Sequence, residues 1–257
     1  MNKKRVVMLA GPGDSTAMIF HALDQVFRIE KVFLEEPVSL PVFLSRRVKR
    51  LGIIRVTGQL LFKILVIPVL LIVSHRRLKE IMRVSGLNVH PLPAERIIHV
   101  RSANDKQTIK TLQELQPDIV VINGTRILSQ GLLESVPAIW INMHAGITPL
   151  YRGVHGAYWA LVQKRPDVCG VTVHVVDAGI DTGGILKQAT IQPTKNDTFV
   201  TYPLLQLSAG IPLLLEAIQE IMKGNVVRKP NPPGESALFT HPTFWGYLWH
   251  WFRGRVK

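Results

Sequence analysis

Short, uninterrupted runs of branched apolar residues that alternate with helical stretches constrain this chain more than any other feature of its sequence. Residues 118–123 (DIVVIN) and 138–143 (AIWINM) are apolar at almost every position, which is typical of strands buried on both faces of a parallel sheet. Helical periodicity precedes the first run at Lys106–Leu115, and a short helix is expected near Ser129–Ser135. The alternation predicts an α/β fold with a mostly parallel central sheet flanked by helices.

The N-terminal part of the chain repeats this alternation around a glycine turn. The pattern predicts a strand at Arg5–Ala10, a helix at Ala17–Phe27 and a second strand at Ile29–Leu34. Asp14 or Ser15 is expected to cap the helix, because a side-chain oxygen there can accept a hydrogen bond from a free backbone N–H.

The turn itself, residues 11–15 (GPGDS), has two interpretations. It resembles the dinucleotide-binding fingerprint, but Thr16 stands where that pattern needs its third glycine. Glycine can be required here for backbone geometry alone. Alternatively, the free N–H groups at the start of the helix form an anion site that favours a phosphate.

Further strands and a long helix are predicted toward the C-terminus. Residues 170–176 and 184–191 predict a pair of strands joined by a turn rich in Gly and Asp. Thr198–Met222 has helical periodicity, which we expect Pro203 and Pro212 to interrupt.

The densest polar chemistry lies between residues 142 and 184. Asn142 and His144 stand two residues apart at the end of a predicted strand, so their side chains point to the same face. This is the carboxyl end of the strand, where open α/β sheets form their ligand crevice. The loop that follows, residues 145–156, is long enough to favour a substrate-shaping role over a simple connection.

His174, Asp177 and Asp181 follow in or just beyond the next predicted strand. Each has a structural alternative: His174 lies among valines, Asp177 can form a turn, and Asp181 can cap the Thr-Gly-Gly turn. His144 can likewise be a hydrogen-bonded loop histidine. An amide, an imidazole and a carboxylate that converge on a crevice would nevertheless suit acyl transfer, because they can stabilise an oxyanion and manage protons. No metal site is predicted, since the nine histidines lack metal-ligand spacing.

These segments together resemble the folate-dependent formyltransferases, which include the glycinamide ribonucleotide, methionyl-tRNA and sugar N-formyltransferases. The family pattern is Asn-x-His-Pro, a Leu-Pro-x-Tyr-x-Gly loop, Gly-x-Thr-x-His and Asp-x-Gly-x-Ile. This chain reads NMHAGITPLYRGVHG and then GVTVHVVDAGIDTGGIL, with Ala145 in place of the Pro and Thr148 in place of the Leu. The resemblance covers roughly residues 4–35 and 95–192, and it implies a Rossmann-like formyltransferase fold for a catalytic domain at residues 1–224.

The resemblance also implies roles for the matching residues. Asn142 and His144 correspond to the oxyanion-stabilising pair, and Asp181 corresponds to the proton-managing carboxylate. The implied reaction is attack by an amine on the formyl carbon of 10-formyltetrahydrofolate, with no metal. Two walls are expected to hold this co-substrate, formed by Arg126, Ile127 and Leu128 and by Val176, Asp177 and Ile180. The acceptor is expected near Gly11, Gly13, Ser15, Tyr151, Arg152 and Gly153.

Among acceptors, an amino-sugar linked to a nucleotide or a lipid is expected. The tRNA enzymes of the family resemble this chain with an added β-barrel domain, for which the 35 residues after Met222 are too few. We therefore expect no nucleic-acid partner. Two alternatives remain: another small amine such as a purine precursor, and a non-catalytic folate- or nucleotide-binding module at a membrane.

The net charge of +13 is concentrated in a hydrophobic helical insert at about residues 40–85. Residues 42–84 hold ten Lys or Arg and one Glu, a net of +9, whereas residues 1–41 balance at zero. Arg55, Gln59 and Lys63 form one polar stripe on an otherwise apolar helix. This pattern predicts a helix in the interface of an anionic membrane, away from the catalytic motifs. A core helix with a snorkelling edge, or a dimer interface, is the alternative.

Residues 225–257 are predicted to form a separate tail rich in aromatic and basic side chains. Its tryptophans interleave with Arg253, Arg255 and Lys257, a mixture that membrane interfaces favour. The alternative is packing against the core or against a partner subunit in a homodimer.

The N-terminus and the cysteine content give an expected location. The apolar stretch after Met1 is too short for a signal peptide. The single Cys169 excludes a disulfide framework. We therefore expect a cytoplasmic enzyme, peripheral on the inner face of the membrane.

Overall fold

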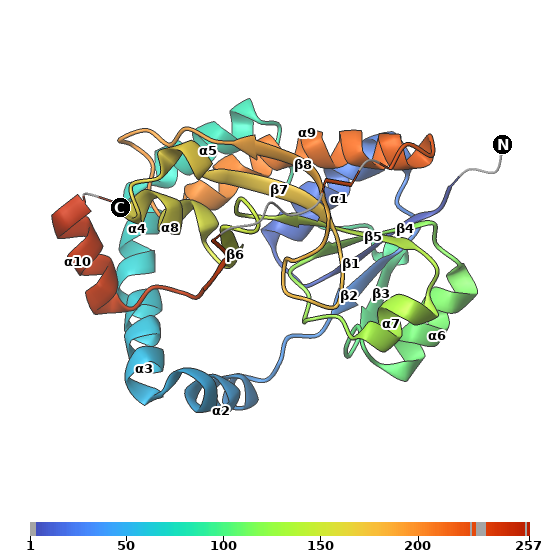
Figure 1. The fold of residues 1–257 in the computed structure, drawn as a ribbon, viewed down its shortest axis with the longest axis horizontal. Coiled ribbons are helices and arrows are strands. Elements are labelled where there is room, and N and C mark those ends of the chain that lie inside the picture. The colour runs from blue at the N-terminus through green and yellow to red at the C-terminus, as the bar shows by residue number, and fades with distance from the viewer. Residues whose placement is uncertain (1–3, 227, 230–234, 255) are drawn as a thin grey trace.

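A seven-stranded sheet forms the centre of the part of the chain that this computed structural model describes, residues 4–226, 228, 229, 235–254, 256 and 257. Its strands are β1 (Val6–Ala10), β2 (Val32–Glu35), β3 (Ile97–Val100), β4 (Ile119–Asn123), β5 (Ile139–His144), β7 (Gly170–Val175) and β8 (Ile185–Thr190), in the order β3-β2-β1-β4-β5-β7-β8. The first five in this order are parallel, and β7 and β8 extend one edge in antiparallel pairing. The predicted mostly parallel sheet is confirmed (Figure 1).

Helices cover both faces of the sheet. They are α1 (Asp14–Phe27) and α9 (Tyr202–Met222) on one face, and α6 (Lys106–Leu115) and α7 (Gln130–Ser135) on the other (Figure 1). Alternate residues of β1 serve the two layers: Met8 packs with α1 and α9, whereas Leu9 packs with α6 and α7. Both are fully buried, which explains why the strand reads as a continuous apolar run.

The order of the strands creates a crevice at the carboxyl ends of β1 and β4. The chain proceeds from β1 outward through β2 and β3, and then returns to form β4 on the other side of β1. Loops that leave β1 and β4 therefore diverge, which is the position where open α/β sheets bind their ligands.

Two local predictions differ from the structure. Gly13, not Asp14 or Ser15, is the N-cap of α1, since Asp14 is already the first residue of the helix. Ser15 Oγ accepts a hydrogen bond from Asn123 Nδ2 at 3.1 Å, and Thr16 Oγ1 donates to the carbonyl of Gly11 at 2.6 Å.

The long helix α9 also differs from its prediction, because it runs without interruption past both prolines. Pro203 lies in the first turn, where the missing N–H would have had no intrahelical partner, and Pro212 lies inside the helix. The helix therefore continues through Pro212 although that residue has no N–H to donate.

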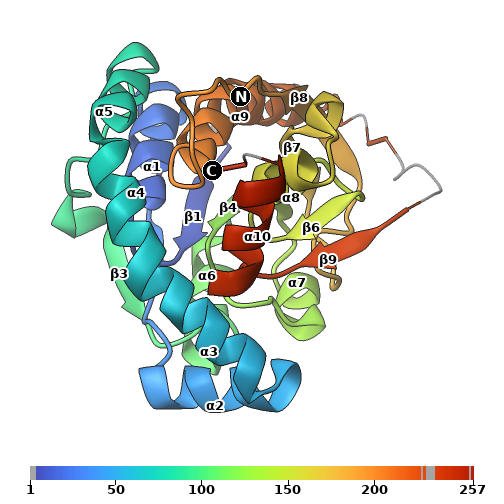
Figure 2. The same cartoon turned by 90° about the vertical axis from the view of Figure 1, so that its left-hand side faces the viewer.

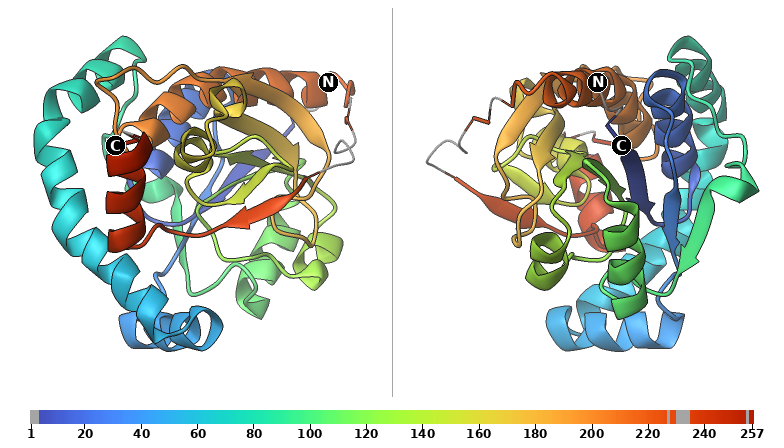
Figure 3. Two further views of the ribbon diagram at one scale, coloured as in Figure 1. Left: turned by 60° about the vertical axis from the view of Figure 1, so that its left-hand side comes forward. Right: turned by 90° about the vertical axis from the view of Figure 1, so that its right-hand side faces the viewer.

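The insert folds as several helical segments. They are α2 (Leu40–Leu51), α3 (Ile53–Leu61), a π-helical turn at Phe62–Val66, α4 (Ile67–Val73) and α5 (His75–Val84). The π-helical turn lies just before Pro68, whose ring and missing N–H disfavour the regular hydrogen-bond pattern of the preceding turn. In Figures 2 and 3, α3 and α4 form one long arm along the outside of the molecule.

The tail returns to the body of the molecule. Its strand β9 (Ala237–Phe239) pairs in parallel with β6 (Tyr151–Gly153), which precedes α8 (Gly156–Val162). Its helix α10 (Phe244–Gly254) packs beside the arm, as Figures 2 and 3 show. Short 3₁₀ turns at Ala94–Arg96 and Pro166–Val168 complete the described elements, and Arg255 lies outside the described residues.

A third apolar cluster joins the insert and the tail to α8 and α9. The ring of Phe62 lies 4.9 Å from that of Phe199 and 5.0 Å from that of Tyr247. Gly58 permits a further contact, because a Cβ there would lie 2.5 Å from the indole of Trp245.

Two described helical stretches have the length and apolar composition of membrane spans: Ile53–Val73 and Tyr202–Met222. The second is α9, whose buried face belongs to the core of the sheet. The first is the arm formed by α3 and α4, of which 28% is buried against the rest of the protein.

We predict that Gly210→Val destabilises the sheet packing of α9. A Cβ at Gly210 would lie 2.5 Å from Met143 Sδ and 2.8 Å from Val171 Cγ2, so the larger side chain overpacks the core. The expected loss is about 1–3 kcal/mol in the free energy of unfolding by urea. Gly131→Ala is the control, because a Cβ there meets nothing within 4 Å, and it should be neutral or stabilising by about 0.5–1 kcal/mol. Equal stabilities for Gly210→Val and the wild type would contradict the packing described.

Candidate active site

Four polar side chains converge where β5 and β7 run side by side. Asn142 and His144 lie at the end of β5, and the register pairs Asn142 with His174 of β7. Asp181 comes from the loop that follows β7. His144, His174 and Asp181 have little exposed side-chain surface, at 6%, 3% and 13%.

The carboxylate of Asp181 is the centre of this cluster. Its Oδ2 accepts a hydrogen bond from the backbone N–H of Gly153 at 3.0 Å and lies 3.4 Å from Nδ1 of His144. Its Oδ1 lies 3.4 Å from Nδ2 of Asn142 and 3.7 Å from Nε2 of His174. Asp181 has a left-handed backbone (φ 53°), a conformation that Asp and Asn adopt more readily than most residues.

The hydrogen bonds of His174 fix the orientation of the Asn142 amide. His174 Nδ1 lies 2.9 Å from the carbonyl oxygen of Val175, which can only accept, so this nitrogen carries the proton. The other nitrogen, Nε2, then accepts from Nδ2 of Asn142 at 3.2 Å. Asn142 consequently presents its N–H groups to His174 and Asp181.

His144 is oriented in a similar way. Its Nε2 donates to the carbonyl oxygen of Tyr151 at 2.7 Å, so in the neutral ring Nδ1 is an acceptor that faces Asp181. Burial lowers the pKa of His144 below 6.5 despite the nearby charge of Asp181. Burial alone would raise the pKa of Asp181, but the neighbouring imidazoles of His174 and His144 and the Gly153 N–H together lower it. At neutral pH the pair is therefore a neutral imidazole beside an ionised carboxylate.

The loop between Asn142 and α8 is held close to this pair. A Cβ at Gly146 would lie 2.4 Å from the Tyr151 carbonyl oxygen and 2.8 Å from His144 Nε2, so only glycine fits. Thr172 Oγ1 donates to the carbonyl of Gly146 at 2.8 Å and accepts from the N–H of Thr148 at 3.1 Å. These bonds fix the loop that presents Gly153 to Asp181.

A cavity of about 760 Å³ opens over the four polar groups. Asn142, His144, His174 and Asp181 all line it. Its remaining walls come from the end of β4, the loop after β7, the insert and the tail. No group of three or more His, Cys, Asp or Glu among the described residues has the arrangement of a metal site.

The residues predicted to hold the co-substrate all line this cavity: Arg126, Ile127, Leu128, Val176, Asp177 and Ile180. Arg126 stabilises the cavity wall, because its guanidinium donates hydrogen bonds to Glu35 Oε1 at 2.9 Å and to the carbonyls of Arg101 and Glu36. Asp177 likewise forms the turn, since its Oδ1 accepts from the N–H of Gly179 at 3.0 Å.

Most residues predicted to bind the acceptor lie behind the cavity wall. Gly153 lines the cavity, whereas Gly11, Gly13, Ser15, Tyr151 and Arg152 do not. The glycine turn supports the wall instead, because the N–H of Gly11 donates to the carbonyl of Asn123 at 2.9 Å. Tyr151 is buried with its hydroxyl on Gln163, and Arg152 Nη1 donates to the carbonyl of Ile180 at 3.1 Å.

The structure adds cavity residues that the sequence did not indicate. Arg47, Arg50 and Arg55 of the insert line the cavity, so the prediction that the positive block lies away from the catalytic motifs is wrong. The insert folds back because its polar stripe binds the tail. Gln59 Nε2 donates to the carbonyl of His241 at 2.8 Å, and Arg55 Nη2 donates to Thr240 Oγ1 at 3.0 Å.

The sequence favours a structural role for His174, and the structure shows that its Nε2 holds the Asn142 amide in the cavity. The sequence could not predict this contact, because it does not show that β7 pairs with β5 and places His174 opposite Asn142. His155 and His241 also form a hydrogen-bonded pair, with 2.8 Å between His155 Nε2 and His241 Nδ1, and His241 lines the cavity.

Comparison with known proteins shows what the chain is similar to. The sequence model of a family described as formyl transferase matches residues 66–210. Methionyl-tRNA formyltransferase of Clostridium beijerinckii is 30% identical over 151 residues, which cover 58% of this chain and 47% of that protein. The chain thus spans about half the length of the curated relatives it matches.

Solved structures with the same fold include a sugar N-formyltransferase from Shewanella, with a TM-score of 0.58 at 14% identity over 91% of this chain and 76% of that one. Another is an N-formyltransferase from Helicobacter canadensis in complex with folinic acid and dTDP-3-aminofucose. Its TM-score is 0.55 at 17% identity over 92% of this chain and 70% of that one. The predicted Rossmann-like formyltransferase fold is confirmed.

We predict that Glu35→Ala destabilises the cavity wall. The carboxylate is buried and accepts from the N–H groups of Ala103 and Arg126 and from the Arg126 guanidinium, at 2.8–2.9 Å. Its removal should cost about 3 kcal/mol in the free energy of unfolding, because it leaves buried donors and a charge without a partner. Glu35→Gln keeps an acceptor and should lose clearly less. If both variants matched the wild type in urea unfolding, Arg126 would not be held in the way described.

Proposed function

Because this chain belongs to the formyl transferase family, we propose that it moves a formyl group from 10-formyltetrahydrofolate to a primary amine. The observation that carries the proposal is the convergence of Asn142, His144 and Asp181 on one cavity. An amide donor and an ionised carboxylate beside a proton-accepting imidazole supply what an acyl transfer needs.

Attack of the amine on the formyl carbon places a negative charge on the formyl oxygen. Asn142 is the donor suited to stabilise it, because its N–H groups are held in place and its contact with Asp181 is long, at 3.4 Å. His144 has no hydrogen to offer the oxyanion while it is neutral, since its Nε2–H is bonded to Tyr151. We therefore assign to His144 a role in proton transfer, in place of the oxyanion role that the family resemblance implies.

The proton of the attacking amine goes to Asp181 in this proposal. A carboxylate of lowered pKa is ionised at neutral pH and can accept it. Once Oδ2 is protonated, a small approach from the present separation of 3.4 Å lets it donate to His144 Nδ1, so the imidazole stabilises the intermediate state. The proton then moves to N10 of the folate as the C–N10 bond breaks. The products are the N-formyl amine and tetrahydrofolate.

The walls of the cavity fit a folate. Ile127, Leu128 and Val176 supply apolar surface for a flat ring, and the neighbouring loop 176–181 offers backbone groups for its polar edge. Folinic acid in the Helicobacter canadensis enzyme of the same fold supports this choice of co-substrate.

The arginines of the insert favour an acceptor that carries a phosphate. Arg47, Arg50 and Arg55 line the same cavity, and no ion pair between the described residues involves any of them. Burial and the charges of Arg50 and Arg55 lower the pKa of Arg47, so an anion between them would relieve a repulsion. An amino-sugar linked through phosphate to a nucleotide or a lipid supplies both the amine and the anion. dTDP-3-aminofucose in the Helicobacter canadensis enzyme belongs to this class.

We predict that Asp181→Asn lowers kcat by about 10²–10⁴-fold, the usual contribution of a general base. Asn tolerates the left-handed backbone of this position, so the fold should persist. The measurement is release of tetrahydrofolate from 10-formyltetrahydrofolate with a panel of sugar-nucleotide amines, lipid-linked amino-sugars, small amines and tRNA. Asp167→Asn, at an exposed carboxylate paired with Arg165, is the matched control.

Near-normal turnover of a folded Asp181→Asn variant would refute the assigned role. Binding of folate without transfer to any amine of the panel would instead favour the non-catalytic module. Transfer to a purine precursor or to tRNA alone would replace the amino-sugar as the acceptor.

We predict that Arg50→Ala raises KM for a phosphate-linked acceptor about fivefold and that Arg50→Glu raises it further. A partly exposed ion pair contributes about 1 kcal/mol, and kcat should change little because none of the bonds described for the catalytic cluster involves Arg50. Lys49→Ala on the same helix is the control, because Lys49 is exposed and does not line the cavity. A rise in KM for the folate alone would assign the arginines to the carboxylates of its glutamate tail.

A further inference from the structure

We propose that α3, α4 and α10 form a docking surface for an anionic lipid bilayer, and that the groove between α4 and α10 receives one acyl chain. This surface lies outside the cavity of the catalytic cluster. The inference therefore stands or fails independently of the formyl transfer, because vesicle binding needs no substrate.

The arm formed by α3 and α4 turns an aliphatic face outward. Ile54 and Ile72 are 74% and 76% exposed, and other members of the face are Ile53, Ile64, Leu65, Val69, Leu71 and Val73. The predicted polar stripe faces the tail through Arg55 and Gln59, and only Lys63 of that stripe lacks such a bond among the described residues. A contiguous aliphatic face of this kind on a protein surface marks a site of interaction.

Helix α10 continues this face with aromatic side chains. Trp249 and Phe252 are 56% and 75% exposed, and the guanidinium of Arg253 lies 4.4 Å from the centre of the Trp249 ring. The two helices are held side by side, because Trp245 packs on Gly58 of the arm (Figures 2 and 3). Exposed tryptophan beside arginine is typical of protein segments at the level of lipid headgroups.

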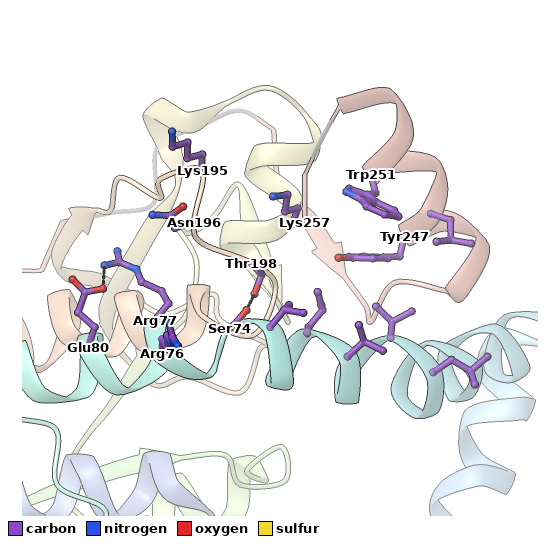
Figure 4. A pocket seen from close by; sticks show the side chains of 16 residues that line it. Ser74, Arg76, Arg77, Glu80, Lys195, Asn196, Thr198, Tyr247, Trp251 and Lys257 are labelled. Atoms are coloured by element: carbon purple, nitrogen blue, oxygen red, sulfur yellow. Dashed lines mark hydrogen bonds and ion pairs between the residues drawn. The ribbon is translucent and has the colours of Figure 1, made fainter.

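A groove of about 710 Å³ separates α4 from α10, and its character changes along its length. At one end, Leu65, Val69 and Val73 face Tyr247, Leu248 and Trp251 across an apolar gap. Arg76 and Lys195 lie toward the other end, and Lys257 lies between the two ends, as Figure 4 shows. Glu80, the side-chain carboxylate among the described lining residues, pairs with Arg77 at 3.0 Å, and Arg77 also binds the buried Asp197 at 2.8 Å. An apolar slot with a cationic end matches an acyl chain attached to an anionic headgroup.

The basic residues favour a bilayer over a second copy of this chain. Exposed cations lie at both ends of the aliphatic face, with Arg46 and Lys49 on α2, and Lys79 and Arg83 on α5. Residues 42–84 carry a net charge of +9. Two copies that met through this face would bring like charges together, whereas anionic headgroups attract each Lys or Arg near the membrane surface by about 1 kcal/mol.

The test is flotation of the full chain with phosphatidylcholine vesicles, with and without phosphatidylglycerol. We expect binding to the anionic vesicles, weaker binding at high sodium chloride, and little binding to neutral vesicles. Ile72→Glu should weaken binding about tenfold or more, because it places a charge where an aliphatic side chain would be buried. Val26→Glu is the matched control, since Val26 is an exposed aliphatic residue on α1, outside this surface. Ile64→Glu repeats the test if Ile72→Glu does not fold.

Insertion of an acyl chain into the groove can be measured separately with the same vesicles. Anionic phospholipids brominated on the acyl chain should quench tryptophan fluorescence, and Trp251→Phe should remove part of that quenching. Three results would overturn the proposal: no binding at low salt, equal loss of binding in Val26→Glu, or a dimer in sedimentation that Ile72→Glu dissociates while vesicles have no effect.

Discussion

The Asp181 carboxylate holds together every part of the proposed catalytic cluster. One oxygen accepts the Gly153 N–H and faces His144, and the other faces Asn142 and His174. These contacts join the last residues of β5, the end of β6 and the end of β7 to the loop that follows β7. A charge in so enclosed a position is costly unless donors stabilise it, and here the Gly153 N–H and the Asn142 amide do so.

The sequence predicted those parts of the site that depend on local geometry. Period-2 spacing was enough to place Asn142 and His144 on one face, and a continuous apolar run was enough to identify β4 and β5 as buried strands. Contacts between segments that are distant in the chain could not be predicted from the sequence. The role of His174 depends on its register with Asn142, and the orientation of the insert depends on the bond from Gln59 to His241, 182 residues away. Composition showed that residues 42–84 are unusually basic and apolar, but it did not predict which side of the helix contacts the tail.

The insert has two chemically different sides. Its inner side places Arg47, Arg50 and Arg55 in the cavity and is fixed by Arg47 Nε on Gln59 Oε1 at 2.9 Å. Its outer side is aliphatic. The high positive charge of the chain therefore has two distinct uses in our proposals: a few arginines meet the anionic part of a substrate, and the others surround an apolar face that meets lipid.

The tail connects the inner and outer sides of the insert, because it contacts both the cavity and the groove. Residues 238–241 line the cavity, while a few residues later Trp245 packs on Gly58 and α10 forms one wall of the groove beside α4. The hydrogen-bonded pair His155–His241 then connects the tail to the start of α8, next to the catalytic loop.

Burial lowers the pKa of His155 to about 3 and that of His241 to about 4, with the charge of Arg47 acting in the same direction, so the pair is uncharged at neutral pH. A bilayer bound to α3, α4 and α10 would thus hold the arginine-lined wall of the cavity in a fixed orientation to the membrane. An acceptor anchored in lipid by a phosphate-linked chain would meet that wall first, and its amine would lie further in, toward Asp181.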